Sequence, residues 1–158
     1  MPVMVAIGFV CALLSRPPAF VERLPAVVDV VLESHRTEDF AGLPFRRRSE
    51  PFHGHLLHRT DATKKDGLYA IVLLRNAKEL AGTTMELELR RLGNPEPCRT
   101  TVSIGTDRAK FREIWVGFTK ITIAVDEIVA WRVRFLRGNE IVAEKSSFLF
   151  VDGSPWKL

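Results

Sequence analysis

The sequence predicts an all-β fold, an antiparallel β-sandwich, on three observations. Apolar Trp131, Val133 and Phe135 alternate with arginines. A second alternating segment lies at 84–89, and short Gly- and Asn-containing turn signals separate such segments from their neighbours. Alternation places apolar side chains on one face of a strand and charged side chains on the other. We therefore expect each strand to bury one face against a second sheet.

The N-terminal part is apolar and is interrupted by prolines. The run 1–14 is too short for a membrane-spanning helix, which takes about 20 residues, and it lacks the flanking features of a secretory signal. We expect a buried strand or a short core helix there, with a signal-like role as the alternative. Residues 19–34 fit a helical face, but Pro25 and the valines after it favour a strand. Our interpretation is a short helical turn at 18–24 and then a strand at about 26–33.

Residues 35–65 form a polar connection that contains all four histidines and three consecutive arginines. We expect one short strand within it, at about 52–57. A connection this long inside a compact domain is uncommon and is often functional. The chain of 158 residues suits a single domain. We divide it into an N-terminal apolar segment and polar His/Arg-rich connection (1–66) and a β-sandwich core (67–151).

Within that core, extended segments follow one another at the spacing typical of a sandwich. The expected strands are 68–74, 84–89, 99–104, 114–118, 120–125, 131–135 and 141–151. The count of six or seven strands in the last 90 residues leaves room only for short turns between them. The whole segment is therefore predicted to form a β-sandwich, with a β-meander in the C-terminal third of the chain.

The last hairpin, around Gly138-Asn139, has two possible registers. A two-residue loop suits a primed turn and places Val133 opposite Glu144. A three-residue loop instead places Arg134 opposite Glu144 and pairs the apolar Phe135 and Ala143. We favour the second register, because it pairs opposite charges and keeps apolar residues together.

Six residues near the C-terminus form an aromatic-rich strand, a Gly-Asn turn and a Phe-x-Phe strand. They are Trp131, Phe135, Gly138, Asn139, Phe148 and Phe150. With this pattern, segment 67–151 resembles the immunoglobulin-like sandwich modules of bacterial proteins. The resemblance implies an immunoglobulin-like antiparallel β-sandwich that works as a binding or assembly module, and it transfers no active site.

Three histidines, His53, His55 and His58, lie within six residues. On one strand His53 and His55 would point to the same face and could share a divalent metal. The remaining ligand candidates are His58, His35 and Asp61. The His-x-His pair looks like the start of the cupin metal motif, but positions 59–61 hold Arg, Thr and Asp where cupins place a glutamate. A polar loop with ordinary hydrogen-bonding histidines is the competing interpretation.

The run Arg46, Arg47 and Arg48, with Lys64 and Lys65, predicts a basic surface. Such a surface can bind nucleic acid, with Phe45, Phe52 and Tyr69 stacking on bases, or an acidic protein. The formal net charge of +4 is mild, and nucleic-acid binders concentrate charge more sharply. We therefore expect Arg46, Arg47 and Arg48 to contact a protein partner.

Familiar catalytic signatures are absent from the sequence: it has no Gly-x-Ser-x-Gly, Cys-x-x-Cys, Gly-x-Gly-x-x-Gly or phosphate loop. Asp126-Glu127 could be a carboxylate pair, but we expect a turn there. Cys11 and Cys98 indicate two free thiols in a reducing compartment, the cytoplasm. We predict a non-catalytic module without a cofactor that acts through protein–protein contacts or as a homo-oligomer. A metal-dependent protein with one divalent metal and a nucleic-acid-binding protein are the alternatives.

Overall fold

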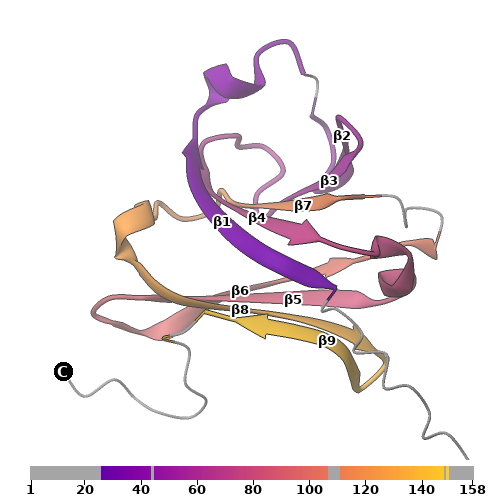
Figure 1. Ribbon diagram of the computed structural model, residues 1–158. Helices are drawn as coiled ribbons and strands as arrows, with labels where there is room; N and C mark the ends of the chain where they lie inside the picture. The colour runs from indigo at the N-terminus through magenta and orange to yellow at the C-terminus, as the bar shows by residue number, and fades with distance from the viewer. Residues whose placement is uncertain (1–25, 44, 107–110, 148, 150–158) are drawn as a thin grey trace, which may run out of the picture.

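The computed structural model describes residues 26–43, 45–106, 111–147 and 149. These residues form nine strands in two sheets that lie face to face, with three short 3-10 helices (Figure 1). The expected all-β sandwich is confirmed. The segments predicted at 1–14 and 18–24, Cys11, and the residues Phe148 and Phe150 lie outside the described residues. Within the described ranges, no helix is long and apolar enough to cross a membrane.

The first sheet has five strands in the order β1-β4-β7-β3-β2. Their bounds are β1 Val27–His35, β2 Ser49–Phe52, β3 His55–Arg59, β4 Gly67–Leu74 and β7 Glu113–Phe118. All neighbours are antiparallel except β3 and β7, which are parallel. Three of the five strands precede residue 67, so the sandwich extends beyond the expected core of 67–151.

The second sheet has four antiparallel strands in the order β6-β5-β8-β9. Their bounds are β5 Thr84–Arg91, β6 Asn94–Ser103, β8 Ile128–Arg137 and β9 Glu140–Ser146. The 3-10 helices are η1 Thr37–Phe40, η2 Ala77–Leu80 and η4 Val125–Glu127. Asp126 and Glu127 lie in η4, just before β8, as expected for turn residues.

The main core fills the space between the two sheets. On β5, Met85, Leu87 and Leu89 are fully buried, and the charged residues between them face outward, as their alternation predicts. Buried residues of β4 and β7 in the facing sheet, and of the neighbouring strand β8, belong to the same core. Cys98 is partly buried against this core. Burial of about 25 cal/mol per Å² of apolar surface makes this interface the main source of stability.

The predicted strand at 120–125 is wrong, because these residues form a loop that leads into η4. The backbone N–H groups of Thr119 and Lys120 both donate to the Thr60 hydroxyl, at 2.9 and 3.1 Å, instead of to a neighbouring strand. Ile123 is nevertheless buried. Its apolar side chain packs into the core from a loop, so it does not indicate a strand.

The last hairpin combines features of both registers considered above. Arg134 lies opposite Glu144 and Phe135 opposite Ala143, which confirms the favoured pairing. The turn itself, however, contains only Gly138 and Asn139, with Arg137 and Glu140 as the closing pair. An irregularity between residues 135 and 136 shifts the register by one residue and reconciles the short turn with the pairing.

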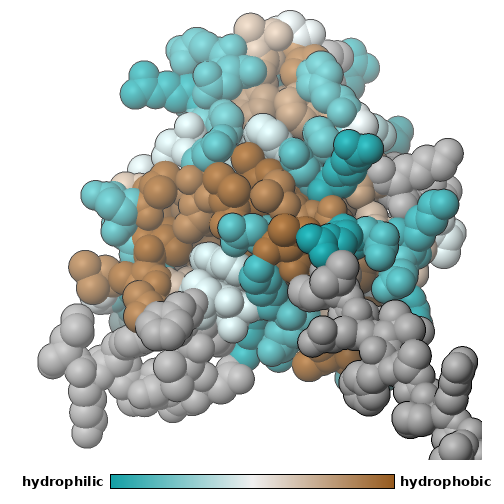
Figure 2. Space-filling model, in the orientation of Figure 1, coloured by the Kyte–Doolittle hydropathy of each residue, from teal (hydrophilic) through white to brown (hydrophobic). Residues whose placement is uncertain are grey.

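One side of the sandwich is formed by two edge strands, β1 and β9, which lie in contact. The Lys145 ammonium of β9 donates to the Val28 carbonyl, and the Asp29 carboxylate accepts from the Val30 N–H. Val28 and Val31 are exposed, and Figure 2 shows a hydrophobic band over the face that β1 crosses in Figure 1. Side chains that bind edge backbone groups hinder pairing with another chain.

Candidate functional site

A second, smaller cluster covers the outer face of the first sheet. Its buried members are Phe40, Leu57 and Tyr69, and the residues packed against them are Leu43, Phe45, Phe52 and Trp115. The ring centroids of Phe40 and Tyr69 lie 5.3 Å apart, and those of Phe40 and Phe45 lie 5.5 Å apart. Phe40 and Phe45 belong to the connection between β1 and β2. The cluster therefore fastens the connection that carries the three arginines onto the sheet.

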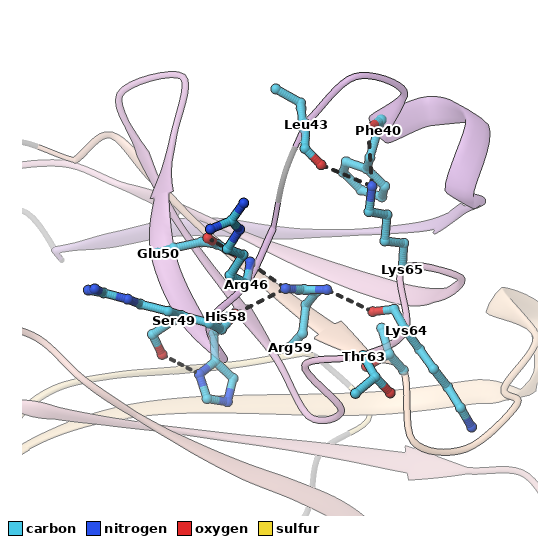
Figure 3. Close-up of polar contacts among 12 residues, drawn as sticks. Phe40, Leu43, Arg46, Ser49, Glu50, His58, Arg59, Thr63, Lys64 and Lys65 are labelled. Atoms are coloured by element: carbon cyan, nitrogen blue, oxygen red, sulfur yellow. Dashed lines mark hydrogen bonds and ion pairs between the residues drawn. The ribbon is translucent and has the colours of Figure 1, made fainter.

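Arg59, on β3, lies at the centre of the contacts in Figure 3 and is only 1% exposed. Its Nη2 donates to the Glu50 carboxylate at 3.1 Å and to the Arg47 carbonyl at 3.0 Å. Its Nη1 donates to the Lys64 carbonyl at 3.0 Å. The guanidinium also lies 5.1 Å from the centroid of the Phe45 ring, within cation–π range. One buried cation thus joins the loop before β2 to the loop after β3.

Lys65 has a comparable structural role. Its ammonium donates to the carbonyls of Leu43, at 3.0 Å, and Phe40, at 3.5 Å, and lies 5.3 Å from the Phe45 centroid (Figure 3). The charge of Lys65 therefore satisfies carbonyls of its own chain. Lys64 is exposed and pairs weakly with Asp61 at 3.9 Å. The basic surface is consequently smaller than the sequence predicts.

Arg46, Arg47 and Arg48 project into solvent from a loop whose backbone is held at each of these residues. The Arg46 N–H donates to the Glu50 carboxylate at 3.4 Å. The Arg47 and Arg48 carbonyls accept from Arg59, from its guanidinium and its backbone N–H respectively. Within the described part of the chain, the three guanidinium groups form no ion pair. The structure therefore presents three uncompensated cations on a fixed backbone.

The three clustered histidines do not converge. The predicted strand at 52–57 is instead a hairpin, since His53 and Gly54 have φ values of 45° and 80° and form the turn between β2 and β3. Two positive φ values are typical of a type I′ turn. His53 and His55 therefore do not share a strand face, and His55 lies 3.7 Å from Glu113. His58 is three residues from His55, so the two point to opposite faces of β3.

The other proposed ligands are also engaged elsewhere. His35 contacts Glu33 at 3.1 Å and Asp39 at 3.3 Å. The Asp61 carboxylate accepts from the Thr63 hydroxyl and N–H, and these bonds hold its pKa below its usual value. Across the described ranges, no group of three or more His, Cys, Asp or Glu side chains is arranged to hold a metal ion.

His58 connects the two sheets. Its Nδ1 is 2.7 Å from the Ser49 hydroxyl on β2, and its Nε2 is 3.4 Å from the Thr100 hydroxyl on β6. The side chain is 5% exposed. Burial, together with the positive charge of Arg48, lowers the pKa of His58 to about 4. His58 is therefore neutral at physiological pH and offers one N–H donor.

This pKa predicts a pH-dependent stability. The unfolded state takes up a proton on His58 near its ordinary pKa of 6.5, whereas the folded state resists until about 4, so folding stability falls as the pH drops between these values. From about pH 7 to about pH 5, wild type should lose about 2 kcal/mol more than His58→Gln, because glutamine does not titrate. Urea unfolding at several pH values measures this difference. Parallel pH profiles for the two proteins would contradict it.

A polar cleft opens between the two sheets on the side away from β1 and β9. It has a volume of about 350 Å³ and is lined by Arg48, His58, Thr60, Arg99, Thr100 and Thr101. The Arg99 side chain is 67% exposed and donates to Glu88 at 3.1 Å. The cleft therefore adjoins the loop of the three arginines and is lined on its other side by three residues of β6.

Glu88 organises the outer face of the second sheet. It is 5% exposed and accepts hydrogen bonds from Arg90, Arg99 and Arg132, at 3.3, 3.1 and 3.3 Å. Burial alone would raise the pKa of Glu88, but the bonds from Arg99 and Arg90 hold it below its usual value. One carboxylate is thus surrounded by three guanidinium groups, so this group of four side chains carries a net positive charge.

Comparison with known proteins adds no assignment. No protein-family model, no curated protein and no solved structure matches this chain. The functional argument therefore depends on the chemistry of the side chains described above. The basic loop held by Arg59 and the cleft beside it are the two features that combine charge, exposure and fixed geometry.

Sequence reasoning identified the exposed arginines but missed the residues that fix them. Arg59 had no distinguishing signal apart from its place two residues after the buried Leu57, on the same face of β3. Glu50 follows the arginine run closely and was a detectable partner. Arg99 joins the site only because β6 forms the edge of the facing sheet, a relation that local pattern does not reveal.

Proposed function

We propose that this protein is a non-catalytic, immunoglobulin-like β-sandwich module that binds an acidic protein partner through Arg46, Arg47 and Arg48. The observation that carries the proposal is the contact between the buried Arg59 and the backbone of this loop. A fixed loop loses little conformational entropy when it binds, so its charges are pre-organised for a partner. Arginine forks suit carboxylates, which they can bind through two parallel hydrogen bonds.

The position of the aromatic residues favours a protein over a nucleic acid. Binding of single strands uses aromatic side chains on which bases stack. Phe45, Phe52 and Tyr69 are instead packed into the cluster under the loop, and Tyr69 is 0% exposed. The loop thus offers charge without a stacking surface. Glu50 and Asp61 also lie close to the basic residues and limit the positive field.

The contacts along the edge of β1 make this edge a less favourable binding surface than the arginine loop. Strand addition at this edge would have to displace the contacts of Lys145 with Val28 and of Asp29 with Val30. The three arginines have no such contacts to break within the described ranges. Homo-oligomerisation through β1 is therefore only a second mode of protein–protein contact in this proposal. The presence of two cysteines supports a cytoplasmic location.

Charge reversal of the loop tests the proposal. An oligo-glutamate peptide with a fluorescent label should bind the full chain, with an affinity that falls as salt rises. The variant Arg46→Glu/Arg47→Glu/Arg48→Glu should weaken binding by at least about tenfold, because three attractive contacts become repulsive. Fluorescence anisotropy measures the affinity, and light scattering of the same samples reports whether wild type and variant have the same mass.

A matched variant separates the loop from net charge. Arg75, Lys78 and Arg112 are exposed and lie on other elements, so their replacement by glutamate changes the net charge equally. This control should keep most of the affinity. Equal losses of affinity in the two variants would show that binding depends on overall charge and would reject the loop as the site. Tighter binding of a single-stranded oligonucleotide than of the peptide would replace the protein partner with a nucleic acid.

A further inference from the structure

The cleft between the sheets has a chemistry distinct from the loop. Its lining combines two guanidinium groups, Arg48 and Arg99, with three threonines and the neutral imidazole of His58. No carboxylate lines it among the described residues. Its volume of about 350 Å³ falls at the lower end of small-ligand sites, which span about 300–1,000 Å³. The site is therefore rich in donors and small.

The two arginines approach the cleft from different sheets. Arg48 immediately precedes β2, at the edge of the first sheet, and Arg99 belongs to β6, at the edge of the second. The backbone of Arg48 is fixed because its carbonyl accepts from the Arg59 N–H at 2.8 Å. Arg99 is oriented by its hydrogen bond to Glu88, which Arg90 and Arg132 also contact. The backbone of Arg48 is thus fixed, and Arg99 is held by a carboxylate that it shares with two other arginines.

His58 marks the floor of the cleft. Its ring lies between the hydroxyls of Ser49 and Thr100, so the imidazole N–H and these hydroxyls form a polar chain from one sheet to the other. Arg48, from the loop, is the charged group that acts on the ring, and Arg99, from β6, lines the same cleft. Its neighbour on β7 is the apolar Val116. A negative charge in the cleft would face cations on two sides and polar donors below.

We propose that this cleft binds a tetrahedral oxyanion, a phosphate or sulfate group, between Arg48 and Arg99. Guanidinium groups are the preferred protein partners of such oxyanions, because their planar donors match two oxygen atoms at once. Thr60 and Thr100 line the same cleft and carry further hydroxyl donors, and the Thr100 hydroxyl also contacts His58. This inference goes beyond the proposed binding of an acidic partner, since it requires Arg99 and the cleft and does not require Arg46 or Arg47.

The test titrates the full chain with inorganic sulfate at constant ionic strength. Sulfate keeps a fixed charge over the pH range of the experiment. NMR should show saturable shifts confined to Arg48, His58 and the β6 residues that line the cleft, and the pKa of the His58 ring should rise when sulfate is bound, because the anion offsets the charge of Arg48. Arg99→Gln should weaken binding about tenfold. Arg75→Gln, at an exposed arginine outside both the loop and the cleft, should bind as wild type does.

Two results decide whether the cleft binds an oxyanion, and a comparison of peptides identifies the source of that anion. Shifts that rise linearly with sulfate, or that spread evenly over all basic residues, would overturn it. Saturable binding lost in Arg99→Gln and kept in Arg46→Glu/Arg47→Glu would support it, even if the oligo-glutamate peptide fails to bind either protein. A phosphoserine peptide that binds tighter than both free phosphate and its unphosphorylated form assigns the anion to a protein, whereas equal binding of free phosphate and the phosphopeptide assigns it to a free ion.

Discussion

Replacing Arg59 by alanine is expected to lower the free energy of unfolding by about 3–5 kcal/mol. The substitution leaves the Glu50 carboxylate, which is 15% exposed, without its partner at 3.1 Å. It also removes the donors to the Arg47 and Lys64 carbonyls and the contact with the Phe45 ring. Removal of one member of a buried ion pair is costly because the remaining charge stays desolvated. Urea unfolding of wild type and Arg59→Ala measures the loss.

Two further variants separate the ion pair from the loop. Arg47→Ala removes an exposed arginine and should change stability by less than about 0.5 kcal/mol. The pair Arg59→Met/Glu50→Leu removes both charges and should recover much of the loss. Trypsin should cut after the exposed arginines faster in Arg59→Ala than in wild type, because the loop backbone is released. Equal cleavage rates would contradict the role of Arg59 as the anchor of the loop.

Gly117→Ala is expected to destabilise the protein by about 3 kcal/mol, although alanine is usually the better residue inside a strand. Gly117 lies on β7 directly between Tyr69 on β4 and Arg59 on β3. A Cβ atom there would lie 2.6 Å from Cε1 and 2.8 Å from Cζ of Tyr69. The absence of a side chain at this position leaves room for both large neighbours.

The Tyr69 ring cannot move aside cheaply. It is fully buried, its hydroxyl donates to the Lys65 carbonyl at 2.7 Å, and its pKa is raised to about 12 by burial. His35 and Phe40 contact it, each with a centroid distance of 5.3 Å. In a Tyr69→Leu background, Gly117→Ala should cost less than about 1 kcal/mol, since the clash is gone. The same cost in both backgrounds would reject the steric explanation.

The strands of the second sheet were predictable because their environment is simple. The central strands β5 and β8 each have a buried apolar face and a charged face, so alternation in segments such as 84–89 marks both the strand and its orientation. The pairing of Arg134 with Glu144 was likewise predictable from charge. The turn was not, because the irregularity after Phe135 depends on the geometry of the whole hairpin.

The first sheet was harder to predict because both of its faces are covered. Residues 68–72 are all buried, which removes the alternation that identifies a face. The turn at His53 and Gly54 was missed because any non-glycine residue is uncommon at a positive φ, so only Gly54 indicated a turn. The candidate functional site was also only partly predictable from local sequence patterns. Its exposed arginines are visible in the sequence, whereas Arg59 and Arg99 reach it through contacts between distant strands.

The parallel pairing of β3 with β7 has a consequence for how the chain acquires its structure. β4, β5 and β6 are all synthesised between these two strands, so the β2–β3 hairpin has no sheet to join until β7 has formed. The arginine loop should therefore reach its final shape late in folding, after β4 and β7 have met. Pulse-labelling hydrogen exchange during refolding should protect the amides of β5 and β8 before those of β3, and the reverse order would exclude this sequence of events.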